Sequence, residues 1–236
     1  MAILTFLGTR GEIKEKTENH YYHSSLLIQL SQPYPFRLLL DYGRIHAYDL
    51  SLLQPDALLI THAHPDHYLW TLQKADSAVP VYLTQETMEY GSFTPCNPQI
   101  FVPYQQFSVG PCQIMSYRVL HSIRCPAVGF KITLPDYQVL AYNPDLVDII
   151  VKEHILPGVD YYIGDGSTVK TNLVRRKGEM LFGHTRISTQ INWCKKYGIQ
   201  NIIFTHLGQD TIAHENNFLE LCSECVLAYD RMKITI

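Results

Sequence analysis

The stretch LLITHAHPDHYLW, residues 58–70, places three histidines and one aspartate directly after an apolar run. Alternate side chains of an extended segment share a face, so His62 and His64 can bind one metal ion together. The proline that follows fixes the backbone and turns the chain, so that Asp66 and His67 can face a second point nearby. A catalytic zinc ion takes three protein ligands and a water. Four candidate ligands in one loop therefore indicate two metal ions.

Further candidate ligands stand at the ends of other apolar runs. His121 ends IMSYRVLHS, His206 ends NIIFTH, and Asp145 follows VLAY. Each residue alone would be typical of an ordinary loop or core position, and a histidine-rich surface loop is the alternative for residues 58–70. Taken together, the loop and the strand ends supply five histidines and two aspartates. This is the complement that a two-metal hydrolase requires.

The 236-residue chain has the composition of an ordinary globular protein, with 46% hydrophobic and 17% charged residues. Its formal net charge of −3 supplies no overall positive field that would attract long nucleic acid. The apolar run at the N-terminus is too short for a signal sequence or a membrane span. We therefore expect a cytoplasmic protein that does not associate with membranes.

The six cysteines are scattered, and only Cys222 and Cys225 form a CxxC pair. A lone pair of this kind lacks the second pair of ligands that a structural zinc site needs. Apolar residues at helical spacing around it predict a C-terminal helix from Leu219 to Tyr229. Core packing of the two thiols is the favoured interpretation, and metal binding is the alternative.

Short apolar runs bounded by Gly, Pro and polar turns predict a strand-rich chain. The predicted strands are 3–8, 24–30, 36–43, 56–62, 79–84, 114–122, 127–133, 137–142, 201–206 and 232–236, with a hairpin turn at 134–137. Helical periodicity occurs at 145–154 and at 188–198, where Gly198 is a stop signal. Strands and helices recur without a linker, so we predict one α/β domain of layered sheets spanning residues 1–236.

The motifs of the chain resemble the metallo-β-lactamase superfamily almost from end to end. The segments that carry the resemblance are FLGTRG, LLLDYG, THAHPDH, LHS, AYNPD, YIGDGS, GHTR, FTH and AYDRMKITI. The resemblance implies a four-layered αββα sandwich with a dinuclear metal site at one edge of the two sheets.

Carried over position by position, the resemblance implies a ligand set for two divalent ions. The first metal would be held by His62, His64 and His121, the second by Asp66, His67 and His206, with Asp145 bridging the two. Asp41 would lie beneath the metal loop as a supporting carboxylate, and a cap at the end of its strand is the alternative role. Histidine-rich ligand sets favour zinc, while the carboxylates also admit manganese, iron or nickel.

The mechanism expected of such a site uses a hydroxide bridging the two metals as the nucleophile, with Asp66 orienting it. The segment HSIRCPAVGFKI resembles the branch of transfer-RNA 3′-processing endonucleases and related phosphodiesterases. In that branch, Asp165 and His184 occupy the places of an acidic residue and a catalytic histidine. A protonated His184, supported by Asp165, could donate a proton to the leaving oxygen. A loop turn and a helix cap are the structural alternatives for these two residues.

The expected substrate is a small phosphodiester, such as a cyclic nucleotide, a cyclic phosphate or a short oligonucleotide. The long protruding arm of the transfer-RNA enzymes has no counterpart here, so long nucleic acid is not expected. The basic residues Arg175, Arg176 and Lys177, joined by Arg124 and Arg186, form either a phosphate clamp or a solvated loop.

Two other functions remain open at this stage. A lactonase or thioesterase could use the same metal ligands without His184. A degenerate fold could also bind metal as a sensor or scaffold without catalysis. The 16 tyrosines would allow an aromatic interface between copies of the chain, although burial alone explains them.

Overall fold

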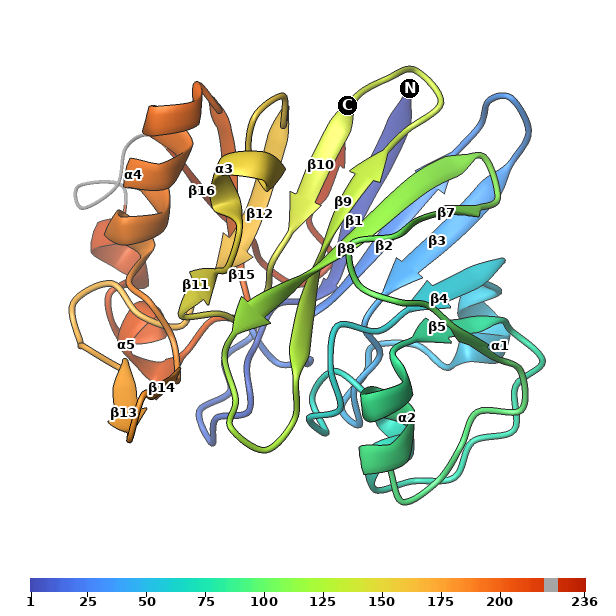
Figure 1. The fold of residues 1–236 in the computed structure, drawn as a ribbon, viewed down its shortest axis with the longest axis horizontal. Coiled ribbons are helices and arrows are strands. Elements are labelled where there is room, and N and C mark those ends of the chain that lie inside the picture. The colour runs from blue at the N-terminus through green and yellow to red at the C-terminus, as the bar shows by residue number, and fades with distance from the viewer. Residues whose placement is uncertain (219–224) are drawn as a thin grey trace.

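The computed structural model describes residues 1–218 and 225–236. Two β-sheets form its centre (Figure 1). The seven-stranded sheet has the order β17 (Lys233–Thr235), β1 (Ala2–Gly8), β2 (Ser25–Leu30), β3 (Phe36–Leu40), β4 (Ala57–Leu59), β5 (Val81–Leu83) and β6 (Pro98–Ile100).

The second, eight-stranded sheet contributes the other half of the core. Its order is β11 (Asp148–Ile149), β8 (Cys112–Leu120), β9 (Ala127–Thr133), β10 (Val139–Tyr142), β12 (Tyr161–Asp165), β15 (Asn201–Thr205) and β16 (Val226–Leu227), and β7 (Gln106–Val109) pairs with β8. A separate hairpin joins β13 (Arg175–Lys177) to β14 (Met180–Phe182).

Helices cover the outer faces of the two sheets. They are α1 (Leu50–Leu53), α2 (Gln85–Tyr90), α3 (Lys152–Ile155), α4 (Ile187–Tyr197) and α5 (Gln209–Ala213), with 3₁₀ turns at Leu69–Thr71 and Glu215–Asn217. Figure 1 shows α3, α4 and α5 on the side of the eight-stranded sheet and α1 and α2 beside the other sheet. This is the four-layered αββα arrangement that the family resemblance implies.

The alternation of side chains along each strand explains how a sheet buries residues on both of its faces. In β3, Leu38 and Leu40 belong to the core between the sheets, where they join residues such as Phe130 of the opposite sheet. Leu39 points the other way and packs in the outer cluster with Leu53 of α1. Because successive side chains of a strand face opposite sides, an almost continuous apolar run is needed when both faces are covered.

Helix α4 confirms the prediction for residues 188–198. Ile187, Ile191 and Cys194 are buried at helical spacing and pack against the eight-stranded sheet. Gly198 follows the helix with φ of 75°, a left-handed conformation that glycine adopts without steric cost.

Two helix predictions are wrong in part. Within 145–154, the segment Asp148–Ile149 is instead strand β11, because it pairs with the end of β8, and only Lys152–Ile155 is helical. The predicted helix 219–229 lies partly outside the described residues. Its described end contains strand β16, in which Val226 pairs with Ile203. Tertiary pairing overrides local periodicity in both places.

Of the CxxC pair, Cys222 lies outside the described residues, and Cys225 is buried in the core beneath α4. Among residues 1–218 and 225–236, no helix is long and apolar enough to cross a membrane.

The sheet topology brings several strand ends to one edge. Strands β3, β4 and β5 run parallel in one sheet, and β10, β12 and β15 run parallel in the other. Strand β8 is antiparallel to β9, which is antiparallel to β10, so β8 shares the direction of β10. The loops that follow parallel strands meet at the same edge, which is where binding sites are commonly built.

Candidate metal centre

The first group of candidate ligands lies where β4, β8 and β10 end. Its members are His62, His64, His121 and Asp145, whose ligand atoms all lie within 4.8 Å of one another. Asp145 Oδ1 is 3.0 Å from Nδ1 of His121, and Nε2 of His121 is 3.2 Å from Nδ1 of His64. The structure thus brings together the three histidines expected at the first metal.

The second group contains Asp66, His67 and His206, again within 4.8 Å. Oδ2 of Asp66 lies 3.1 Å from Nε2 of His206 and 3.5 Å from Nε2 of His67. His206 follows β15 and Asp66 follows β4, so the group joins the two sheets. These are the three residues expected at the second metal.

Asp145 lies between the two groups. Its Oδ2 is 3.5 Å from the Nε2 atoms of His62, His67 and His206. One carboxylate oxygen therefore faces imidazoles of both groups, which is the position that a bridging ligand occupies. The geometry agrees with the role implied for Asp145.

Two unpaired nitrogens test whether these residues fit metal ions. Among residues 1–218 and 225–236, Nε2 of His62 and Nε2 of His67 are buried and have no hydrogen-bond partner. Buried polar atoms are almost always paired, so two orphans facing the same carboxylate need an explanation. Imidazole nitrogens are common metal ligands, and both orphans face Asp145. The donor set fits two divalent cations.

The pKa values of the histidines differ between the two ligand groups. Burial lowers the pKa of His62 well below its ordinary value and that of His121 to about 4, so both imidazoles are neutral, the form that coordinates metal. Burial also acts on His67, but the charges of Asp66 and Asp41 outweigh it and raise the pKa of His67 to about 10. A cation in this place would displace the proton that these carboxylates hold.

Asp41 supports the metal loop from below. Its carboxylate is fully buried and accepts hydrogen bonds from the backbone N–H of Thr61 at 2.8 Å and from Tyr142 at 3.3 Å. Its Oδ2 also lies 2.9 Å from Nδ1 of His67. Such a partner keeps the proton of the ring on Nδ1 and leaves Nε2 for a metal. The contact with His67 agrees with the supporting role implied for Asp41, and the bond from the Thr61 N–H agrees with the alternative of a strand-end cap.

His184 and Asp165 meet beside the second group. Nδ1 of His184 is 2.9 Å from Oδ2 of Asp165 and 2.8 Å from Oδ1 of Asp145. Burial lowers the pKa of His184, but the two carboxylates outweigh it and raise the value to about 10. Asp145, Asp165, His184 and His206 also have the spacing of a third ligand group, so the geometry admits His184 as a proton donor or as a ligand.

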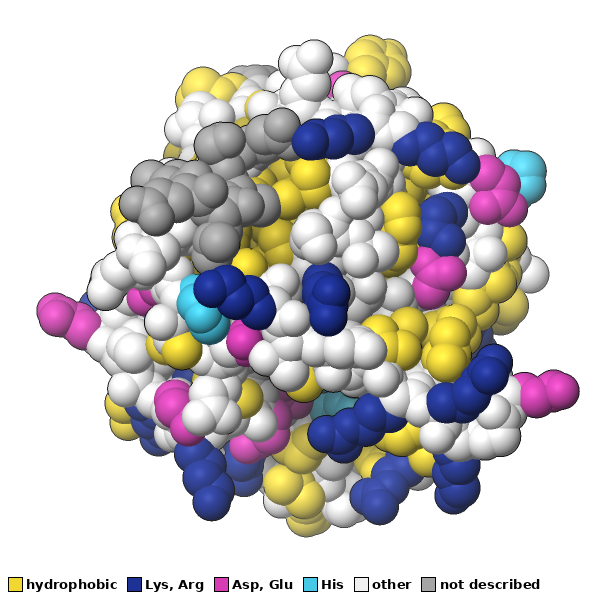
Figure 2. All heavy atoms as spheres, turned by 90° about the vertical axis from the view of Figure 1, so that its left-hand side faces the viewer, with side chains coloured by type: hydrophobic (Ala, Val, Ile, Leu, Met, Phe, Trp, Pro, Cys, Tyr) yellow, Lys and Arg dark blue, Asp and Glu magenta, His cyan; other side chains and the backbone are white. Residues whose placement is uncertain are grey.

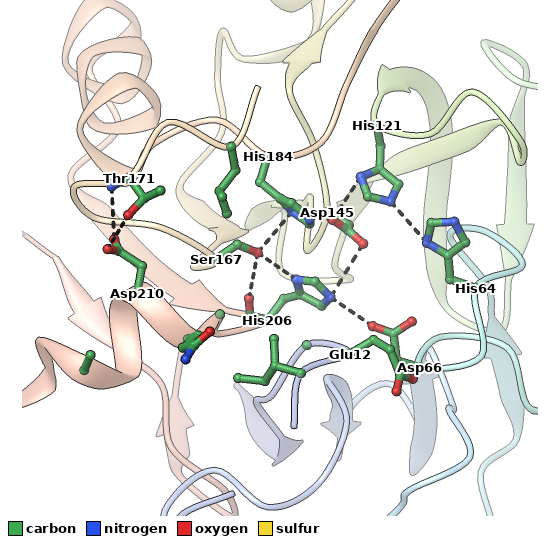
Figure 3. Close-up of a pocket in the computed structure, with 16 residues that line it drawn as sticks. Glu12, His64, Asp66, His121, Asp145, Ser167, Thr171, His184, His206 and Asp210 are labelled. Atoms are coloured by element: carbon green, nitrogen blue, oxygen red, sulfur yellow. Dashed lines mark hydrogen bonds and ion pairs between the residues drawn. The ribbon is translucent and has the colours of Figure 1, made fainter. Parts of the chain in front are cut away.

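Ser167 was not singled out from the sequence. Its Oγ is 3.0 Å from Nδ1 of His184 and 3.1 Å from Nδ1 of His206. Figure 3 draws both contacts as dashed lines. Serine is not a typical ligand for these metals, and the only sequence signal was its position directly after the GDG turn that contains Asp165.

The metal ligands open into a cavity of about 580 Å³. Figure 3 shows its two sides, with Glu12 near Asp66 at one side and Thr171 and Asp210 at the other. A cavity of this size suits a small molecule. The N-terminal wall around Glu12 was also missed by sequence analysis.

The basic residues expected near the site lie outside this cavity. Arg175, Arg176 and Lys177 form the exposed strand β13, and Arg124 and Arg186 are also exposed. None of the five lines the cavity. Figure 2 shows that the face carrying α4 and α5 mixes Lys and Arg side chains with Asp and Glu side chains.

Residues 19–160, more than half of the chain, match the family described as a beta-lactamase superfamily domain. The chain belongs to the beta-lactamase superfamily. This membership confirms the resemblance drawn from the motifs and agrees with the prediction of a metal-dependent hydrolase. Among curated proteins, no match was found.

Three solved structures are similar in fold to this chain. The metallo-beta-lactamase fold protein YhfI from Bacillus subtilis has a TM-score of 0.72 at 17% identity, over 99% of this chain and 98% of the other. A diphosphatase from the PhnP family has a TM-score of 0.71 at 19% identity, over 100% and 98%. The short form of human tRNase Z has a TM-score of 0.67 at 17% identity, over 99% of both chains.

Proposed function

We propose that residues 1–236 form one hydrolase domain that cleaves a small phosphodiester at a dinuclear metal centre. His62, His64 and His121 would hold one divalent ion, Asp66, His67 and His206 would hold the other, and Asp145 would be shared. Zinc is the favoured metal, with manganese, iron and nickel also compatible with the donors. When bound, the two ions would supply Lewis acidity and lower the pKa of coordinated water.

The environment of His184 is the observation that favours a phosphodiester. Its Nδ1 is engaged by Asp165 and Asp145, whereas its Nε2 makes no hydrogen bond with the described residues. The ring also lines the cavity. An imidazolium held in this way can donate a proton to a leaving alkoxide oxygen. Hydrolysis of an alkyl phosphodiester needs that proton, because an unprotonated alkoxide is a poor leaving group.

The leaving group therefore provides a sharp test. With two metals bound, we expect the protein to hydrolyse both bis-p-nitrophenyl phosphate and 2′,3′-cyclic CMP. The variant His184→Gln should lower kcat on the cyclic nucleotide by about 10²–10⁴-fold, the usual contribution of a general acid. It should alter turnover of bis-p-nitrophenyl phosphate far less, because p-nitrophenolate leaves without a proton. His154→Gln, which changes a side chain that is 78% exposed, is the matched control.

Other results would contradict this function. Equal loss on both phosphodiesters would show that His184 maintains the site and donates no proton. Turnover of lactone or thioester substrates alone would assign the centre to acyl transfer. Absence of any turnover with two metals bound would favour a sensor or scaffold.

A further inference from the structure

The walls of the cavity differ from those of a typical phosphate site. Beyond the candidate ligands, His184 and Ser167, its lining consists of Gly11, Glu12, Ile13, Thr171, Leu173, Gly208, Gln209, Asp210 and Ala213. Of the residues that the structure describes, no lysine or arginine lines the cavity, and no phenylalanine, tyrosine or tryptophan does so. The walls are aliphatic or neutral, apart from two carboxylates.

Asp210 carries a negative charge that other residues hold in place. Its carboxylate accepts hydrogen bonds from the backbone N–H groups of Val169 and Lys170, both at 2.8 Å, and from the Thr171 hydroxyl at 2.7 Å. Burial raises the pKa of Asp210, but these hydrogen bonds outweigh it and keep the pKa well below its usual range. The group is therefore ionised at neutral pH, and the donors that hold it are neutral.

Glu12 contributes the second carboxylate, on the opposite wall. It is paired with Arg44, and its Oε2 lies 3.8 Å from Nε2 of His23. Arg44 offsets part of this charge but does not line the cavity. Apart from His184 at the metal centre, the described lining of the cavity thus offers no cation to an incoming anion.

Resting on the phosphodiesterase function proposed above, we propose that the substrate carries a single phosphate, the one bound at the metal centre, and that its organic groups are uncharged. A second phosphate would need arginine, lysine or a comparable donor cluster to replace its water, and here it would meet Asp210 instead. A nucleobase would find no aromatic ring to stack on. Ile13, Leu173 and Ala213 suit aliphatic parts of an alcohol. The class that fits is a phosphodiester of simple polyols or alcohols, in preference to oligonucleotides and diphosphates.

A pair of substrates isolates the second phosphate. One is the p-nitrophenyl ester of thymidine 5′-phosphate, and the other is the same ester phosphorylated on the 3′ oxygen. Leaving group and nucleoside are identical, so only the extra charge differs. We expect the 3′-phosphate to lower kcat/KM by about tenfold at low salt, as one weakly screened like-charge repulsion would do. The difference should shrink as salt is added, because the walls are open to solvent.

A substitution in the cavity wall tests whether the 3′-phosphate is repelled inside this cavity. Leu173→Arg places a cation in the lining and should narrow or reverse the difference between the two esters, whereas Leu173→Met should leave the ratio unchanged. Faster cleavage of the 3′-phosphorylated ester by the unaltered protein would overturn the proposal. If Arg175→Ala abolished that preference, strand β13 would be the phosphate site. Failure to cleave either ester and also bis-p-nitrophenyl phosphate, with two metals bound, would instead overturn the phosphodiesterase function itself.

Discussion

Asp41→Asn is the substitution that separates the support of the metal loop from the ligands themselves. The amide side chain keeps the shape of the carboxylate, and asparagine tolerates the left-handed backbone at this position, where φ is 56°. What changes is the chemistry of one atom. Oδ2 of Asp41, which faces Nδ1 of His67 at 2.9 Å, becomes an NH₂ group if the amide oxygen stays on the N–H of Thr61.

The consequence for the metal follows from the tautomer of His67. Its Nδ1 would have to accept a hydrogen bond from the new NH₂ group, so the ring proton would move to Nε2, the orphaned nitrogen that faces Asp145. Loss of such a supporting partner lowers metal affinity by about 10–100-fold. This corresponds to about 1.4–2.8 kcal/mol of binding free energy, at about 1.4 kcal/mol for each factor of ten.

The assay is a titration of the metal-free protein with Zn²⁺ against a competing chelator, which resolves two affinities. We expect Asp41→Asn to weaken one of them and to leave the other nearly unchanged, because the contact of Asp41 is with His67 and not with His121. Asp56→Asn is the matched control, since Asp56 is exposed and its carboxylate accepts the backbone N–H of Arg37. If the folded Asp41→Asn variant bound both Zn²⁺ ions as tightly as the unaltered protein does, the reasoning would be refuted and Asp41 would be only a strand-end cap.

Three further outcomes are expected. His67, with a pKa of about 10, is protonated at pH 7 and must lose that proton to bind a metal. Calorimetry in two buffers of different ionisation enthalpy should therefore show at least one proton released, and metal affinity should rise with pH up to about 10. The absence of proton release would contradict this. A Cβ added in Gly11→Ala would lie 2.9 Å from Cε1 of His206, so the metal content of the purified variant should fall below two ions per chain, at a stability cost of about 1–3 kcal/mol in thermal unfolding. Asp210→Asn weakens the hydrogen bonds that hold residues 169–171 in the cavity wall. For a substrate with one phosphate, this loosening should outweigh the lost repulsion and raise KM by about threefold to tenfold, with kcat little changed. An unchanged KM would show that this wall does not contact substrate.

The metal ligands could be predicted from the sequence because their signal is local. His62, His64, Asp66 and His67 share one loop, and their types and order already indicate two binding points. His121 and His206 end strands that run in a common direction, so finding the strands also places their ends at one edge of the sheets. The assignment of individual residues to each metal came from the resemblance to the family.

The errors lie where pairing over long distances decides the structure. Residues 145–154 have helical spacing, yet Asp148 and Ile149 become a strand because the exposed edge of β8 offers backbone partners at Val119 and Leu120. No property of the segment itself reveals that edge. The cavity wall at Glu12 was missed for the same reason, since the N-terminal loop reaches the centre only through the packing of the two sheets.

Ser167 shows why supporting groups are harder to predict than ligands. Its single hydroxyl proton can be donated to the backbone oxygen of His206 at 3.2 Å, so its lone pairs can accept from Nδ1–H of His206 and of His184. With its proton on Nδ1, His206 presents Nε2 to Asp66, just as Asp41 makes His67 present Nε2 to Asp145. Two unrelated side chains, a carboxylate after β3 and a hydroxyl after β12, thus determine which nitrogen of each histidine is free for a metal. Since Ser167 also touches His184, a change in the protonation of His184 would reach His206 through one oxygen atom. The proposed proton donor and one metal ligand are therefore linked by a residue that is neither.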